Sequence, residues 1–171
     1  MDWTLLLEKV VWFGIAAIGF AVLFNVPVRT LPATFILGAV GGFCKLFLLE
    51  HQATIILASL AGSLAIGLLS ISTAHIKHAP PLVFSTPAVI PMVPGILAYR
   101  MMLGLIKLAG DVTGNSYNSI LNETVNNGLK VMLILMSLAG GVAIPMLIAR
   151  KESVKHLRLR KRITGTDKEK V

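Results

Sequence analysis

Long apolar runs separated by short polar segments dominate the pattern of this chain. Five runs predict membrane spans: about Leu5 to Phe24, Leu31 to Leu49, Thr54 to Ala74, Leu82 to Ile106 and Leu129 to Ala149. Each run approaches the roughly 20 residues that a helix needs to cross a hydrocarbon core of about 30 Å. The pattern therefore predicts an all-α integral membrane protein with five transmembrane helices.

The fourth run differs from the others because prolines and a glycine interrupt it. Pro87, Pro91, Pro94 and Gly95 all lie within this run. Each proline removes a backbone donor and clashes with the preceding turn, so we expect a broken helix. Unpaired backbone groups are tolerated in the membrane only where protein or a water-filled cavity surrounds them. Because interrupted spans form substrate sites in secondary transporters, we expect this span to line a site.

Composition and charge agree with a membrane protein. Hydrophobic residues make up 55% of the 171 residues and charged residues only 14%, whereas about a quarter of the residues of a soluble domain are charged. The net charge is +8, but residues 150–171 alone hold nine Lys or Arg against three Asp or Glu. The sequence thus predicts a five-span membrane domain over residues 1–149 and a basic cytoplasmic tail over residues 150–171. This concentration of charge in a tail does not indicate a surface for nucleic acid.

The position of the basic residues also predicts an orientation. Lys and Arg near the ends of spans favour the cytoplasmic side, so the tail places the C-terminus inside. Five spans then place the N-terminus outside. Arg29 and Lys77 fall in inner loops under this assignment, while Asp111 and Glu123 fall in an outer segment, residues 107–127. That segment is rich in Gly, Asn, Ser and Thr and is predicted to be a loop.

Small residues at four-residue spacing mark close contacts between membrane helices. They occur in the second, third and fifth runs, as Gly38 with Gly42, Ser59 with Ser63 and Gly67, and Ser137 with Gly141. Two interpretations remain open at this point. The small residues either pack the helices of one bundle together or form an interface with another subunit.

Two cations and one carboxylate in or beside the apolar runs are candidate functional residues. Lys45 lies late in the second run and Arg100 follows the proline break. Each either extends its charge to the headgroups or binds an anionic substrate, and a guanidinium pairs with a carboxylate in bidentate fashion. Asp111 either caps a turn or carries protons next to a transport path. Burial in the folded protein would separate these alternatives.

Motifs for enzymatic chemistry are not found in the sequence. His75 and His78 are three residues apart, but no third metal ligand lies near them in the sequence. Phosphate-binding loops, nucleophile elbows and H-E-x-x-H motifs do not occur. We therefore expect no enzymatic activity, no metal and no cofactor.

The segment Pro91-Met-Val-Pro-Gly-Ile-Leu-Ala-Tyr-Arg100, followed by Gly110-Asp111, resembles the membrane domain of the threonine/serine exporter (ThrE) family. The resemblance extends from the second run to the fifth. Within that family the chain is similar to the small five-span half that exists as a separate polypeptide. It lacks the large soluble N-terminal region of full-length members, and its basic tail is a further difference.

This resemblance implies a transporter of the bacterial inner membrane. Members are exporters of small amino acids or dicarboxylates driven by the proton-motive force, and split pairs are associated with succinate. A split member needs a complementary five-span subunit. The expected transport path contains Pro91, Pro94, Gly95, Arg100 and Lys45, with Asp111 as the residue for proton coupling. The alternatives are a membrane scaffold or assembly subunit that does not transport, and a pore-forming channel.

Overall fold

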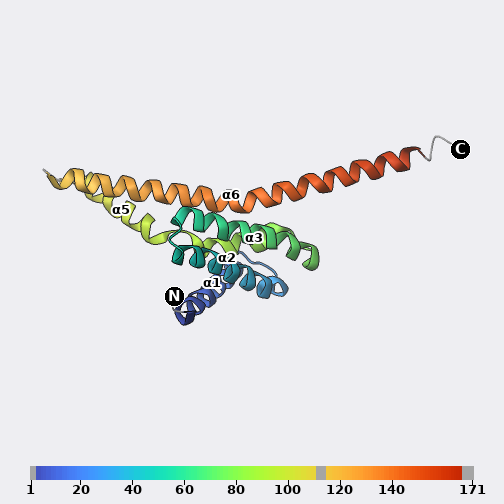
Figure 1. Ribbon diagram of the computed structural model, residues 1–171, viewed down its shortest axis with the longest axis horizontal. Helices are drawn as coiled ribbons and strands as arrows, with labels where there is room; N and C mark the ends of the chain where they lie inside the picture. The colour runs from blue at the N-terminus through green and yellow to red at the C-terminus, as the bar shows by residue number, and fades with distance from the viewer. Residues whose placement is uncertain (1–2, 111–114, 167–171) are drawn as a thin grey trace.

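The computed structural model describes the backbone of residues 3–110 and 115–166 and the side chains of residues 3–110 and 117–149. Every regular element in these ranges is a helix, as the sequence predicts. In chain order they are α1 (Trp3–Leu23), the short 3-10 turn η1 (Val28–Thr30), α2 (Leu31–Glu50), α3 (Ile55–Lys77), α4 (Pro81–Val89), the 3-10 turn η2 (Ile90–Met92), α5 (Gly95–Ala109) and α6 (Asn115–Thr166). Figure 1 shows how they are arranged.

The number of spans agrees with the prediction. Within the described residues, α1, the η1–α2 unit, α3 and the part of α6 from Tyr117 to Ala149 are each long and apolar enough to cross a membrane. The fourth span is divided, because α4 with η2 and α5 pass the same test only as a pair bent by 58°. The chain is therefore a multi-pass membrane protein with a broken fourth span.

Helices α1 to α4 form a bundle in which small residues allow close approach. A Cβ atom at Gly38 would lie 3.1 Å from the Phe13 carbonyl oxygen, and one at Gly42 would meet the Phe13 ring. Helix α4 packs on α1, α2 and α3 and places the fully buried Phe84 in the core. The core lies around α4 and η2, where α2 and α3 of this bundle meet Ile134 and Leu138 of α6.

Serines and glycines join α6 to α3. The Ser137 hydroxyl donates to the Ile56 carbonyl oxygen at 2.9 Å, and the Ser63 hydroxyl donates to the Ser137 carbonyl oxygen at 3.3 Å. A Cβ atom at Gly67 would lie only 2.9 Å from the Gly141 carbonyl oxygen. These residues therefore pack the helices of one chain together, which is the first of the two interpretations of the small-residue pattern.

The prediction of a loop over residues 107–127 is wrong. Helix α5 continues to Ala109 and α6 begins at Asn115, so most of this polar segment is helical. Asn, Ser and Thr lower helix propensity by only a few tenths of a kcal/mol each, and packing of α6 on α5 overcomes that preference. A Cβ atom at Gly104 would contact the side chain of Thr124, whose hydroxyl bonds back to the Ile120 carbonyl oxygen. Together α5 and the start of α6 form a hairpin that projects beyond the ends of α2 and α3 (Figure 1).

Helix α6 is much longer than the predicted fifth span. It runs from Asn115 to Thr166 without interruption, and Pro145 lies inside it. The predicted tail thus begins within a helix, and residues 150–166 continue the fifth span beyond its apolar part. Residues 167–171 lie outside the described part of the chain.

Candidate functional site

The break in the fourth span lies at Val93 and Pro94. Helix α4 tolerates Pro87 and passes into η2, which ends at Met92. Val93 then adopts an extended conformation with a ψ of 134°, as expected for a residue that precedes a proline. Pro94, with a ψ of 69°, caps the start of α5. The bend therefore has a local cause in the sequence Val93-Pro94-Gly95.

Lys45 from α2 lies at this break. Its side chain is only 7% exposed, and its ammonium donates a hydrogen bond of 2.7 Å to the Met92 carbonyl oxygen. An ammonium has three hydrogen-bond donors and no acceptor. Among the described residues, the Met92 carbonyl oxygen accepts one of its hydrogen bonds. The predicted path residues Lys45, Pro91 and Pro94 are thus brought to one place. The snorkelling interpretation of Lys45 does not hold, because its charge is directed to a backbone carbonyl inside the protein.

Two glycines provide the room for this contact. A Cβ atom at Gly62 of α3 would lie 2.7 Å from the Gly41 carbonyl oxygen, would overlap the end of Met92, and would lie 3.4 Å from the Cβ atom of Lys45. Helices α2 and α3 therefore approach each other most closely beside the lysine. Sequence reasoning missed both glycines, although their separation from Gly38 and Ser59 by three residues places them beside predicted packing positions.

Arg100 does not join Lys45 in a buried cluster. It lies on α5, five residues after Gly95, and its side chain is exposed. Helix α5 packs mainly against α6, and Gly104 is its buried residue. The other faces of α5 carry large exposed apolar side chains, among them Ile96, Tyr99 and Met102. Arg100 thus belongs to a helix surface that the described part of the chain leaves open.

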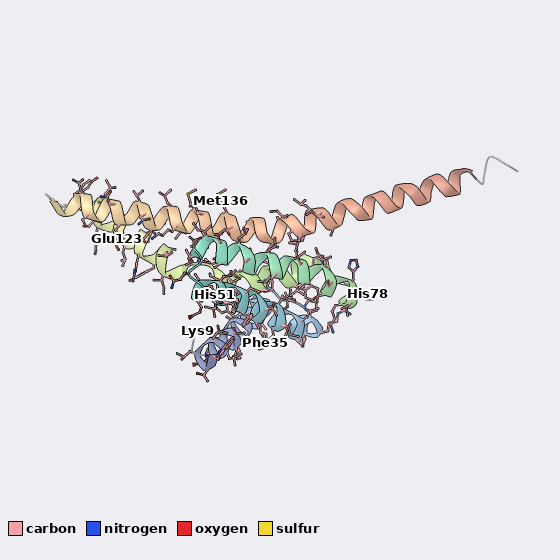
Figure 2. The ribbon with its side chains drawn as sticks, in the orientation of Figure 1. Lys9, Phe35, His51, His78, Glu123 and Met136 are labelled. Atoms are coloured by element: carbon pink, nitrogen blue, oxygen red, sulfur yellow. The ribbon has the colours of Figure 1, made fainter. Side chains whose placement is uncertain are left out.

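The two histidines noted in the sequence lie at the end of α3 and not at the break. Asp111 lies outside the described residues. His75 and His78 line an open groove of about 780 Å³ at the end of α3, and His78 there ends α3 in a left-handed conformation. Figure 2 shows His78 at the end of the bundle opposite to His51 and to the hairpin that carries Glu123.

A second groove, between α4 and α6, holds about 450 Å³ and has an almost wholly apolar lining. Ser85 lines it, and its buried hydroxyl has no hydrogen-bond partner within the described part of the chain. The groove contains no charged side chain. It suits apolar side chains or lipid better than a carboxylate, so the broken span remains the stronger candidate for a substrate site.

A broken span in a small membrane bundle is typical of the class of secondary transporters. The comparison with known families agrees with this class. The family model for the threonine/serine exporter ThrE matches residues 9–148. The chain belongs to this family, whose members are transporters rather than enzymes.

An uncharacterized protein of Haemophilus influenzae is similar to this chain. The two are 31% identical over 143 residues, which cover 84% of this chain and 47% of the relative. The chain thus spans about half the length of that curated relative. No solved structure matches the chain.

Proposed function

We propose that this chain is the membrane subunit of a heteromeric secondary exporter of small carboxylate metabolites, driven by the proton-motive force. The substrate is a dicarboxylate such as succinate, or threonine or serine. Membership of the threonine/serine exporter family supports export. The single observation that carries the proposal is the broken fourth span with the Lys45 ammonium bonded to the Met92 carbonyl oxygen. The break allows the two arms of the fourth span to change their relative direction, and the positive charge of Lys45 favours anions nearby.

Arg100 is the residue that we propose for the substrate carboxylate. Its guanidinium is permanently charged and forks to match a carboxylate, and it is exposed on the helix that follows the break. Lys45 and the sequence Pro91 to Gly95 form the adjacent wall of the path. Asp111, which lies outside the described residues, is the residue that the sequence alone suggests for proton coupling.

The proposed partner is a complementary five-span subunit of the same family in the bacterial inner membrane. The Haemophilus influenzae relative is about twice as long as the matched region, which leaves room for a second unit in one chain. An odd number of spans reverses direction, so two such halves in series form an inverted pair. The N-outside, C-inside orientation proposed for this chain suits the second half of such a pair. The exposed face of α5 would then adjoin the partner.

The experiment compares export by this chain alone, by a homologous five-span partner alone and by the pair. Cells are loaded with labelled succinate or threonine, and efflux is measured with and without a proton-motive force. We expect export only from the pair. Full activity from this chain alone in liposomes would contradict the need for a partner, and normal export by the partner alone would favour the scaffold alternative. Downhill flux without uphill export would favour a channel.

Arg100→Gln tests the site within that pair. Loss of a charge-assisted hydrogen bond costs about 1.5–3 kcal/mol, so substrate affinity should fall roughly ten- to a hundredfold. Arg100→Lys should recover export only in part, because an ammonium lacks the fork of a guanidinium. Lys107→Gln is the matched control, since it removes an exposed cation two turns further along α5. Export at the wild-type rate by correctly inserted Arg100→Gln would place the substrate site elsewhere.

A further inference from the structure

The contact of Lys45 with Met92 replaces a hydrogen bond that the broken helix cannot make. In a continuous α-helix the carbonyl of residue 92 would accept from the amide four residues later. The extended conformation of Val93 interrupts the helix at this point. After the interruption, the Gly95 amide donates a hydrogen bond of 2.9 Å to the Val93 carbonyl oxygen. The Lys45 ammonium reaches the Met92 carbonyl oxygen at 2.7 Å from a helix 47 residues earlier in the chain. A side-chain cation thus ties α2 to the end of the η2 turn.

The charge of Lys45 has no carboxylate beside it among the described side chains. Among the described side chains of the helices packed around this site, the other charged or titratable residues are exposed, except for the half-buried Cys44: Glu8 and Lys9 of α1, Cys44 and Glu50 of α2, His75 and Lys77 of α3, Tyr99, Arg100 and Lys107 of α5, and Tyr117, Glu123 and Lys130 of α6. Helix α4 and η2 carry none. Removing an ammonium from water without a compensating ion is costly, and release of one proton removes that cost.

We propose that Lys45 is the proton-coupling residue of the exporter and that its protonation controls the break in the fourth span; this inference rests on the proposed function. The ammonium releases one proton to water and becomes a neutral amine, and rebinding of one proton reverses the step. A charge-assisted hydrogen bond is roughly twice as strong as a neutral one. The protonated lysine therefore holds Met92 against α2 more strongly than the neutral lysine does, so loss of the proton favours opening of this contact.

The placement of Lys45 resembles that of a coupling ion in other broken-span carriers. Unwound carbonyls and the carboxyl ends of half-helices coordinate cations in such carriers. Here the Met92 carbonyl, at the carboxyl end of η2, receives a cation that is covalently part of the protein. Arg100 cannot exchange a proton in this way, because a guanidinium is not deprotonated in proteins. The two cations thus have separate roles, with Arg100 for the substrate and Lys45 for the proton.

A labelling experiment tests the hydrogen bond between Lys45 and Met92 without a measurement of transport. In a Cys44→Ser background, Val93→Cys reports on the break, because Val93 is 41% exposed. Val28→Cys, at a 79% exposed position in η1, provides the reference. The ratio of their reaction rates with N-ethylmaleimide in membranes removes the part of the pH effect that both thiols share, and the substitutions of Lys45 isolate the rest. We expect the ratio to change severalfold from neutral to alkaline pH when Lys45 is present.

Two substitutions of Lys45 supply the controls for that ratio. Lys45→Arg keeps the charge at all these pH values and should hold the ratio at its neutral-pH level. Lys45→Met has no charge and should hold it at the alkaline level. If Lys45→Met does not fold, as judged by size-exclusion chromatography, the pH dependence of the ratio in Lys45→Arg alone tests the proposal. A wild-type ratio that does not change with pH, or the same pH dependence in Lys45→Arg, would overturn the proposal.

A transport experiment separates this proposal from the proposed function. With the partner present, Lys45→Arg should retain exchange of substrate across the membrane and lose uphill export driven by a proton gradient. Asp111→Asn is the competing variant, because the sequence alone suggests Asp111 for proton coupling. Loss of uphill export in Asp111→Asn with its retention in Lys45→Arg would overturn the assignment in favour of Asp111. Absence of any export by the wild-type pair would refute the proposed function, while the labelling result would still decide whether protonation controls the hydrogen bond between Lys45 and Met92.

Discussion

At the scale of single residues, the glycines at helix crossings determine how closely the helices approach. Gly67 of α3 has no space for a side chain, because a Cβ atom would lie 2.9 Å from the Gly141 carbonyl oxygen and 3.1 Å from the Pro145 ring. Insertion of a methyl group into a well-packed contact costs about 1–3 kcal/mol. We expect Gly67→Ala to lower the midpoint temperature of unfolding in detergent, as measured by loss of the monodisperse peak after heating.

Gly140→Ala is the matched control for that substitution. Gly140 also lies in a membrane helix, but a Cβ atom there would meet nothing within 4 Å. Alanine favours a helix over glycine by about 1 kcal/mol, so Gly140→Ala should leave stability unchanged or raise it slightly. Equal losses for both variants would mean that the α3–α6 crossing does not depend on close approach at Gly67.

Sequence reasoning at this scale identified residues but not their contacts. It selected Lys45 because a cation in an apolar run is unusual, and it predicted the small-residue positions from their spacing. It could not find the acceptor, because Met92 is an apolar residue that contributes only its backbone carbonyl. A backbone group leaves no signal in the side-chain pattern. The role of Gly62 beside Lys45 was hidden for a similar reason, since its importance depends on the pairing of α2 with α3.

At the scale of elements, Pro94 is the expected cause of the bend between α4 and α5. Pro94→Ala removes the restraint that keeps Val93 extended, so the two arms should straighten. Spin labels at Leu82 and Met102, both exposed, should move apart by about 4 Å when a 58° bend is removed from arms that rise about 1.5 Å per residue. We also expect export by the pair to fall.

Pro145→Ala is the control for Pro94→Ala. Pro145 lies inside α6, which remains helical through it, so its replacement should not change the distance between the two labels. If Pro94→Ala also leaves the distance unchanged, the bend is imposed by packing around Met92 and not by the proline.

The projecting hairpin of α5 and α6 gives a second prediction at this scale. A Cβ atom at Gly128 would lie 3.1 Å from the Met101 sulfur. Cysteines at positions 101 and 128, in a Cys44→Ser background, should form a disulfide under mild oxidation, detected by faster migration in a denaturing gel. A cysteine at the exposed Met102 paired with one at position 128 should cross-link much less. Equal cross-linking of both pairs would indicate that the hairpin is not packed as described.

The apolar runs predicted the membrane helices correctly, whereas the polar composition of residues 107–127 led to the wrong prediction of a loop. The first three spans agree with α1, α2 and α3 to within three residues at each end, since a run of this length has few alternatives in a membrane. The polar segment after Lys107 was predicted as a loop, yet most of it is helix α6. Its Thr124 and Asn127 are buried. Tertiary packing on Gly104 decided the structure there, and propensity alone could not reveal it.

At the scale of the whole molecule, the orientation in the membrane is a testable proposal. His78 and His51 mark opposite ends of the bundle (Figure 2), and positions 76 and 52 beside them are exposed. In a Cys44→Ser background, an impermeant maleimide added to intact cells should label Gln52→Cys and leave Ile76→Cys and Arg160→Cys unlabelled. Labelling of Ile76→Cys and Arg160→Cys from outside would show that the chain has the opposite orientation. Cell lysis should make all three accessible.

The arrangement of the whole molecule was only partly predictable from the sequence. The class, the span count and the broken fourth span followed from apolar runs and prolines, because the membrane allows few backbone solutions. The projection of α5 with α6 beyond the bundle did not follow, since it depends on which faces pair. The open face of α5 likewise became visible only in three dimensions. It is the part of the proposed site that the sequence could not place.

The hydrogen bond between Lys45 and Met92 has a consequence for how the chain is inserted during synthesis. Lys45 is synthesised 47 residues before Met92, whose carbonyl oxygen accepts the hydrogen bond from its ammonium. During that interval the lysine lies about 8 Å from the end of its helix, by the rise per residue, and its long stem allows the charge to rest among the lipid headgroups. When α4 arrives, the ammonium must leave the headgroups and move inward. We therefore expect the nascent bundle to mature by a late inward movement of this charge, after most of its helices are already in the membrane.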